Sequence, residues 1–252
     1  MSGKPEIRVA PAQPGWAMKA ADIVRDLSTK AIGDHRHFLF ALSGGSTPER
    51  LYKVLASEPY SEQVDWSRTS FFFGDERCVS PDDPDSNYRL ANQTLFAPLK
   101  ISPDHIYRMK GEAADPEAAA LDYERRLLSI DSAAGKEPPR FDLVLLGLGE
   151  DGHTASLFPG TQALCNRHRL VTVGQSPKGV PKRLTLTLSV INQASVVLFL
   201  AIGANKAGIV KRVLEPEAEP DRQLPAAMII PRNGRLIWLL DEPAATLLSR
   251  SL

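Results

Sequence analysis

Cysteine is scarce in this chain of 252 residues, which contains only Cys78 and Cys165. Two cysteines make no disulfide framework, and they fit a reducing compartment. No apolar run approaches the ~20 residues needed to cross a bilayer, and residues 1–15 lack the apolar core of a signal peptide. We therefore expect a cytoplasmic protein with no membrane partner.

Net charge is also lacking, because 30 basic residues balance 30 acidic ones. The sequence contains no aromatic-and-basic RNA motif and no zinc-finger spacing, so we expect no nucleic-acid partner. A hydrophobic fraction of 43% and a charged fraction of 24% are typical of a soluble globular protein. The length allows one large α/β domain or two small ones. No linker is long enough to separate two domains, so we expect a single domain spanning residues 1–252.

Several common catalytic motifs are missing. There is no GxSxG nucleophile elbow and no HExxH zinc motif. His35 and His37 begin a predicted strand, where their side chains would point to opposite faces, which disfavours a metal site. The sequence GLGEDG fits the dinucleotide fingerprint GxGxxG, but no Asp or Glu occurs between His153 and Leu214 to bind a ribose. We expect neither a metal nor an organic cofactor.

Short apolar runs alternate with segments of helical spacing along the chain. We predict strands at residues 7–10, 37–42, 69–74, 141–146, 170–173, 183–188, 196–202, 228–230 and 236–240. We predict helices at residues 15–32, 49–57, 86–95, 116–128, 203–214 and 242–250, and a turn at residues 133–139. This alternation predicts an α/β fold with a doubly wound, mostly parallel sheet and helices on both faces.

The stretch FDLVLLGLGEDGHTASLFPG, residues 141–160, has the most informative pattern. A buried strand runs directly into a glycine-rich loop that carries Glu150, Asp151 and His153. Ligands bind beyond the carboxyl ends of strands in open α/β sheets. A lone histidine is often structural, but the loop position and the neighbouring carboxylates favour a general acid or base.

A second loop joins the strand at 37–42 to a helix, with Pro48 suited to the first helical turn and Ser46 or Thr47 to the N-cap. Its residues are Ser43, Gly44, Gly45, Ser46 and Thr47. Glycines allow backbone N–H groups to approach an anion, and a helix N-terminus favours negative charge. The loop lacks the Lys-Ser/Thr ending of a P-loop, so a plain turn and an anion site both stay open.

Charged residues follow the strand predicted at 69–74, where Asp75, Glu76 and Arg77 form either a solvated loop or part of a site. The Pro- and Asp-rich residues 80–87 form a loop that could shape or cover a pocket.

Basic residues accumulate between His153 and Leu214 without a compensating acid. They are Arg167, Arg169, Lys178, Lys182, Arg183, Lys206, Lys211 and Arg212. Some of these belong to a solvated face, but Arg183 and Lys206 lie beside predicted strand ends. The simplest interpretation is a site for a small anionic molecule, in particular a phosphate ester.

Three motifs resemble those of the 6-phosphogluconolactonases: ALSGGSTP at 41–48, FFFGDERCVSPDDPDSNY at 71–88 and GLGEDGHTASLFPG at 147–160. The resemblance covers nearly the whole chain in order and length. The family shares its fold with glucosamine-6-phosphate deaminases, whose third motif reads like GxGxDGHxAFNEP. This chain has Leu157-Phe158-Pro159 there and lacks the Asn-Glu pair, which favours the lactonases.

The resemblance implies a sugar-phosphate isomerase/deaminase-like fold and hydrolysis of 6-phospho-D-glucono-1,5-lactone to 6-phospho-D-gluconate in the pentose phosphate pathway. A lactone is an activated ester, so a water and a base suffice. His153 would take a proton from water, and Asp151 would orient the imidazole or the water. No metal or organic cofactor is implied.

The remaining candidate residues would bind the substrate. Arg183 and Lys206, with Ser46 and Thr47, would bind the phosphate. Backbone N–H groups around Gly44-Gly45 and in residues 147–152, or Arg77, would contact the oxyanion or the ring. Ser43 and Asp75 complete the predicted set, although Arg77 and Asp75 could instead pair structurally.

Two other functions stay open, a glucosamine-6-phosphate deaminase-like isomerase and a non-catalytic sugar-phosphate-binding protein. We expect a monomer or a weak homodimer.

Overall fold

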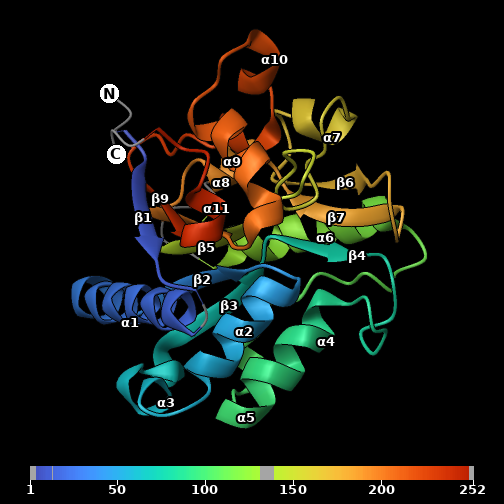
Figure 1. Ribbon diagram of the computed structural model, residues 1–252. Coiled ribbons are helices and arrows are strands. Elements are labelled where there is room, and N and C mark those ends of the chain that lie inside the picture. Colours follow the sequence, from blue (N-terminus) through green and yellow to red (C-terminus); the bar gives the residue numbers. More distant parts are fainter. Residues whose placement is uncertain (1–3, 13, 131–138, 250–252) are drawn as a thin grey trace.

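The computed structural model describes residues 4–12, 14–130 and 139–249 (Figure 1). The predicted turn at 133–139 lies almost wholly outside these residues. The strands are β1 (Glu6–Ala10), β2 (Phe38–Leu42), β3 (Thr69–Phe73), β4 (Asp75–Arg77), β5 (Leu143–Gly147), β6 (Val171–Gln175), β7 (Lys182–Leu186), β8 (Val196–Ala201) and β9 (Arg235–Asp241). The α-helices are α1 (Gly15–His35), α2 (Ser46–Leu55), α3 (Tyr60–Gln63), α4 (Asn87–Ala91), α5 (Ala97–Leu99), α6 (Pro116–Ser129), α7 (Gln162–Cys165), α8 (Leu188–Ile191), α9 (Ala207–Leu214), α10 (Glu219–Arg222) and α11 (Glu242–Ala245). Tighter or wider helical turns are η1 (Trp66–Arg68), η2 (Asn92–Phe96), η3 (Pro103–His105), η4 (Ala204–Lys206) and η5 (Pro225–Met228).

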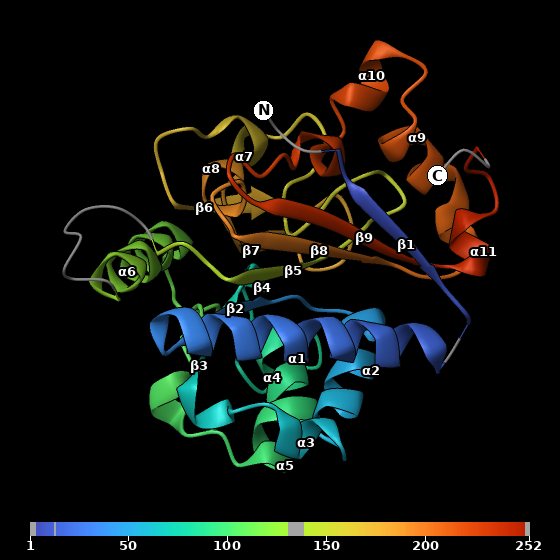
Figure 2. The ribbon, with the colours of Figure 1, turned by 90° about the vertical axis from the view of Figure 1, so that its left-hand side faces the viewer.

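Six strands form a parallel sheet in the order β1-β9-β8-β5-β2-β3. Helices α1 to α5 lie on one side of this sheet, and α9 and α10 lie on the other (Figure 1, Figure 2). Coverage on both faces explains why β3 and β8 are apolar or small at nearly every position and buried along their whole length. The predicted doubly wound parallel sheet is confirmed. Among the helices of the described residues, none combines the length and the apolar composition that crossing a membrane requires.

The strand order reverses between β2 and β5. From β2 the chain moves outward to β3, and after β5 it moves in the opposite direction to β8 and then β9. Loops that leave two such strands diverge, which opens a crevice at their carboxyl ends. The loops at Ser43 and at Gly147, singled out from the sequence, follow β2 and β5.

A second, smaller sheet is antiparallel, in the order β4-β7-β6. Residues 75–77, expected to form a solvated loop or part of a site, form the strand β4. Gly74 joins the two sheets, because its N–H donates to the Leu42 carbonyl (2.8 Å) and its carbonyl accepts from the Leu186 N–H (2.8 Å). The charged residues Asp75 and Arg77 are therefore held on a rigid ladder rather than on a mobile turn.

Two expectations for individual segments were wrong. Residues 228–230 are not a strand, because the Asn192 side chain binds the Met228 carbonyl and the Ile230 N–H, which removes both groups from any ladder. The last helix ends at Ala245, and Glu215 then binds the N–H and hydroxyl of Ser249.

His35 is also placed differently from the expectation. It ends α1, and Arg36 follows it with φ 70° as the C-cap, so the strand begins only at Phe38. The N-cap of α2 is likewise Gly45 rather than Ser46 or Thr47.

Candidate active site

A cleft of about 230 Å³ opens at the reversal point of the large sheet. Its lining residues are Ser43, Gly44, Asp75, Arg77, Gly147, Leu148, Gly149, His153, Thr154, Ala155, Arg183 and Lys206. They come from the loops after β2, β5 and β8 and from the strands β4 and β7. The cleft thus brings together seven of the eleven predicted residues, which are spread over more than 160 positions of sequence.

His153 and Asp151 form a hydrogen-bonded pair beside the cleft. The His153 Nδ1 lies 2.5 Å from the Asp151 Oδ1, which also accepts the His153 backbone N–H at 3.1 Å. The loop closes tightly on the ring: a side chain at Gly149 would put its Cβ 2.0 Å from Nδ1. Asp151 itself lines the adjoining groove rather than the cleft. The pair fixes Nδ1 and leaves Nε2 without a protein partner among the described residues.

The carboxyl group of Asp151 stays ionised at neutral pH. Burial raises its pKa, but the hydrogen bonds from the His153 ring and backbone outweigh burial, so the pKa lies below its ordinary value of 3.8. An ionised carboxylate at Nδ1 favours the tautomer in which Nδ1 carries hydrogen and Nε2 has a free lone pair. That arrangement suits a base.

Phe158 is buried between the imidazole and the basic residues of the cleft. Its ring centroid lies 4.3 Å from that of His153, and the Arg183 Cζ lies 5.6 Å from the Phe158 centroid. The aromatic contact restricts rotation of the imidazole, and a cation over a ring face is favourable. Phe158 therefore fixes His153 and Arg183 relative to each other.

Arg77 and Arg183 lie directly opposite each other on β4 and β7. Like charges at opposed positions of an antiparallel pair are destabilising. Neither guanidinium has a carboxylate partner among the described residues: Arg77 Nη1 donates to the Asp85 carbonyl (2.6 Å), and Arg183 donates to the carbonyls of Val180 (3.2 Å) and Lys178 (3.3 Å). Burial and the Arg77 charge lower the pKa of Arg183. The two charges are positioned without being neutralised, which attracts an anion.

Lys206 adds a third positive charge from η4, at the end of β8. It forms no ion pair within the described part of the chain, and its segment is held from both sides. The Asn205 amide donates to Glu150 (2.9 Å), and the Gly203 N–H, at a φ of 102°, donates to Asp241 (2.9 Å). These bonds fasten the segment that carries Lys206 to the His153 loop and to the end of β9.

The loop after β2 approaches the cleft with its backbone. The Tyr52 hydroxyl binds both the N–H (3.0 Å) and the carbonyl (2.6 Å) of Ser43. Gly44 packs so closely on Asn87 that an added Cβ would lie 1.8 Å from the Asn87 Oδ1. Ser43 and Gly44 line the cleft, whereas Gly45, Ser46 and Thr47 lie outside its lining, at the start of α2.

Asp75 is buried and does not pair with Arg77. It accepts the Ser156 hydroxyl at 2.6 Å and the Asn87 amide at 3.2 Å. The structural pairing of Arg77 with Asp75 that the sequence left open is therefore absent among the described residues. Asn87 and Ser156 were not predicted as site residues, although both lie inside the motifs at 71–88 and 147–160, because their contacts with Asp75 join residues far apart in the sequence.

The other histidines lie away from the cleft. His35 Nε2 is 2.9 Å from Asp142, and His37 Nε2 is 2.7 Å from the Ser70 hydroxyl. Across the described residues, no group of three or more His, Cys, Asp or Glu side chains gathers as a metal site.

These features define a doubly wound α/β protein with a cleft for a small anion and an imidazole–carboxylate pair beside it. The family model described as glucosamine-6-phosphate isomerases/6-phosphogluconolactonase matches residues 12–238. The chain belongs to this family.

Individual relatives narrow the comparison. The chain is 46% identical over 216 residues to the 6-phosphogluconolactonase of Synechocystis sp., covering 86% of this chain and 87% of that one. It is 40% identical over 246 residues to the 6-phosphogluconolactonase of Nostoc sp., covering 98% and 99%. Among solved structures, 6-phosphogluconolactonase from Trypanosoma brucei superimposes with a TM-score of 0.86 at 32% identity, covering 98% and 100%. The resemblance seen in the three motifs is confirmed.

Proposed function

We propose that this chain hydrolyses 6-phospho-D-glucono-1,5-lactone to 6-phospho-D-gluconate in the oxidative pentose phosphate pathway. The observation that carries the proposal is the His153–Asp151 pair beside a cleft whose three cations have no carboxylate partner among the described residues. That combination suits a neutral ester carbonyl attached to a phosphate. The names of the relatives support the same substrate.

The proposed reaction needs one base and one water. His153 Nε2 takes a proton from water as the water oxygen bonds to the lactone carbonyl carbon, and Asp151 stabilises the imidazolium that forms. The tetrahedral intermediate then breaks its bond from that carbon to the ring oxygen. His153 returns the proton to the departing oxygen, which becomes the hydroxyl group of the open-chain product.

The oxyanion would meet donors on the opposite wall of the cleft. The N–H groups of Gly149 and Gly152 already donate within their own loop, to the carbonyls of His153 (2.9 Å) and Gly149 (3.0 Å). This leaves the backbone around Gly44 and the Arg77 guanidinium as the stronger candidates from the predicted set. Arg77 Nε is buried without a protein partner, as expected of a donor that a substrate completes.

The phosphate would lie at the basic side of the cleft, bound by Arg183 and Lys206, because two side-chain cations favour a doubly charged anion. Ser46 and Thr47, at the start of α2 and outside the cleft lining, stay predicted contacts to the phosphate. We also propose a cytoplasmic enzyme with one α/β domain that acts as a monomer or weak homodimer.

The test measures proton release from 6-phosphogluconolactone made in situ, compared with spontaneous hydrolysis. Catalysed release well above the spontaneous rate is expected. Ammonia release from glucosamine 6-phosphate would support the isomerase alternative, against which the missing Asn-Glu pair argues. Binding of 6-phosphogluconate without either activity would indicate a sugar-phosphate-binding protein.

A further inference from the structure

Glu76 is a buried carboxylate next to the cleft that does not line it. Its side chain is 3% exposed, and it forms no ion pair with a side chain in the described residues. A buried carboxylate without a cation is costly unless its oxygens accept several hydrogen bonds. We propose that Glu76 is a positioning residue that holds Arg77 in the cleft, an inference that rests on the proposed function.

All four partners of Glu76 are hydrogen-bond donors. Its Oε1 accepts the N–H groups of Arg77 (2.7 Å) and Asn87 (2.8 Å), and its Oε2 accepts the Tyr88 N–H (2.8 Å) and the Ser86 hydroxyl (3.1 Å). Three of these donors lie at the start of α4, where a negative charge is favourable. Glu76 therefore fastens the far end of the loop 78–86 to β4.

That loop end determines where the Arg77 guanidinium lies. The carbonyl of Asp85, the residue before Ser86, accepts the only side-chain hydrogen bond of Arg77 within the described chain, at 2.6 Å. Repulsion from Arg183, opposite on β7, favours movement of Arg77 away from the cleft. The backbone of Arg77 has constraints besides its bond to Glu76, because it pairs with Arg183 on the β4–β7 ladder and its carbonyl lies so close to Gly111 that an added Cβ there would be 2.1 Å away. Only the side chain remains free to move.

A carboxylate is the group that this position requires. Two ionised oxygens accept four donors, whereas an amide would turn its NH₂ group toward N–H groups and lose about two of the bonds. Burial raises the pKa of Glu76, and the three backbone hydrogen bonds oppose that rise. Substitution of Glu76 by Gln therefore keeps the size of the side chain and removes its ability to accept all four hydrogen bonds.

The experiment is a double-mutant cycle of wild type, Glu76→Gln, Arg77→Ala and the double variant. Each is assayed for kcat/KM with the phosphorylated lactone and for Tm. Loss of hydrogen bonds to a charged group supports an expected fall of about 10- to 100-fold for Glu76→Gln. In the Arg77→Ala background the same change should alter kcat/KM by less than about twofold, because the group it positions is gone. The fall in Tm should persist in both backgrounds.

A purely structural role predicts something different. In that case the two losses in kcat/KM multiply, and a further fall of tenfold or more in the double variant overturns the proposal. Glu124→Gln is the matched control, because Glu124 also accepts backbone N–H groups but lies at the far end of the small sheet. It should lower Tm and show no coupling to Arg77.

Two further measurements apply if the Glu76→Gln variant does not fold or if the wild type has no lactonase activity. If Glu76→Gln does not fold, Ser86→Ala takes its place, because it removes one donor to Glu76. It should lower kcat/KM by a smaller factor, and the loss should again disappear in the Arg77→Ala background. A loss of the same size in both backgrounds overturns the proposal. If the wild type hydrolyses no lactone, the proposed function fails on its own. The cycle is then measured as the Kd for inorganic phosphate, where coupling between Glu76 and Arg77 supports the positioning role and additivity overturns it.

Discussion

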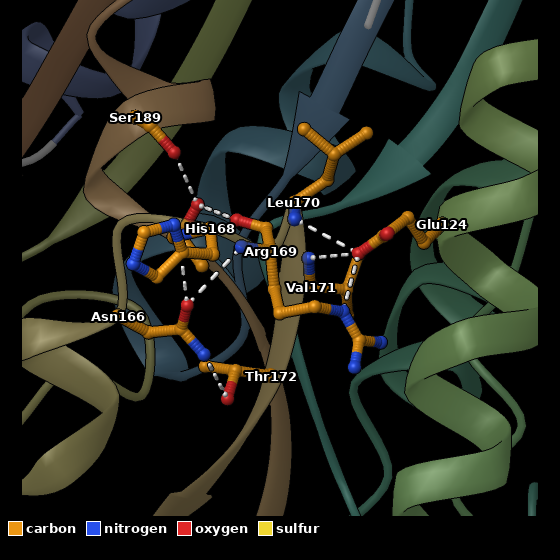
Figure 3. Close-up of polar contacts among 9 residues, drawn as sticks. Glu124, Asn166, His168, Arg169, Leu170, Val171, Thr172 and Ser189 are labelled. Atoms are coloured by element: carbon orange, nitrogen blue, oxygen red, sulfur yellow. Dashed lines mark hydrogen bonds and ion pairs between the residues drawn. The ribbon is translucent and has the colours of Figure 1, made fainter.

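The two ends of the small sheet hold their arginines in opposite ways. At the end near α6, Arg169 precedes β6 and pairs with Glu124, whose Oε2 accepts its Nε at 3.0 Å. At the cleft end, the guanidinium groups of Arg77 and Arg183 form hydrogen bonds only to backbone carbonyls within the described residues. Figure 3 shows the first arrangement, with the Glu124 carboxylate directed at Arg169 and at the backbone of Leu170 and Val171.

The difference distinguishes a structural cation, Arg169, from the proposed substrate-binding cations, Arg77 and Arg183. A carboxylate neutralises the guanidinium that it fixes, whereas a carbonyl fixes it and leaves the full charge. The Glu124 network also includes Asn166, whose side chain accepts the amides of His168 and Arg169 and donates to Thr172 (Figure 3). Such a network joins α6 to β6 and makes that end a rigid support for the charges at the other end.

The largest expected effect comes from removing the imidazole of His153, the proposed base. His153→Ala should fold normally and lose about 100-fold or more in kcat, because a positioned general base contributes about 10²- to 10⁴-fold. Circular dichroism and Tm establish folding, and proton release gives the rate. Turnover near that of the wild type would remove His153 from the mechanism.

The second-largest expected effect comes from removing one of the cations at the cleft, and it tests whether these cations bind the phosphate. Arg183→Ala and Lys206→Ala should each lower kcat/KM for the phosphorylated lactone by about 10- to 150-fold, since a charge-assisted contact contributes about 1.5–3 kcal/mol. The unphosphorylated lactone should be a poor substrate and should respond little to either change. Equal losses on both substrates would show that the residues act on structure or on the carbonyl, and no loss on either would place the anion elsewhere.

Arg169→Ala is the matched change at the other end of the sheet. It leaves the partly buried Glu124 without its cation, so unfolding should become easier by about 1–3 kcal/mol. Chemical denaturation measures this loss, and kcat/KM should change by less than about threefold. A kinetic loss as large as that of Arg183→Ala would abolish the distinction between the two ends.

How far the sequence predicted this arrangement depends on the range of the contacts. Apolar runs gave the buried strands, and short motifs gave the loops after β2 and β5, because both depend on neighbouring residues. The antiparallel sheet was missed, because the pairing of Arg77 with Arg183 joins positions more than a hundred residues apart and leaves no local pattern. The sequence did not show which of the other basic residues after His153 are neutralised, since Arg169 and Arg212 pair with Glu124 and Asp221, which lie outside that segment.

A smaller effect concerns pH. The pKa of Asp151 lies below its ordinary value of 3.8 in the folded chain, so its contribution to stability is complete above that value and is lost as the pH falls through the folded pKa. The Tm difference between wild type and Asp151→Asn is compared with its value at about pH 5, where the carboxyl group is ionised in both the folded and the unfolded state, and it should shrink below about pH 4. A difference that grows on acidification would contradict this.

Removal of metal ions is expected to have no effect on activity. No metal-ligand group forms at either end of the small sheet in the described residues, and the proposed base acts on water directly. Dialysis against a strong chelator should leave kcat/KM unchanged. Lost activity that zinc or magnesium restores would contradict the metal-independent reaction.

The opposed pair Arg77 and Arg183 also makes the fold responsive to the ligand. Two guanidinium groups facing each other across a ladder raise the free energy of the native state, and an anion bound beside both lowers it. Binding to the native state alone adds RT ln(1 + [L]/Kd) to the unfolding free energy, about 2.7 kcal/mol at a hundredfold excess over Kd. Phosphorylated sugar in the cell would then stabilise the small sheet. The protein would resist unfolding more strongly at a higher concentration of this ligand.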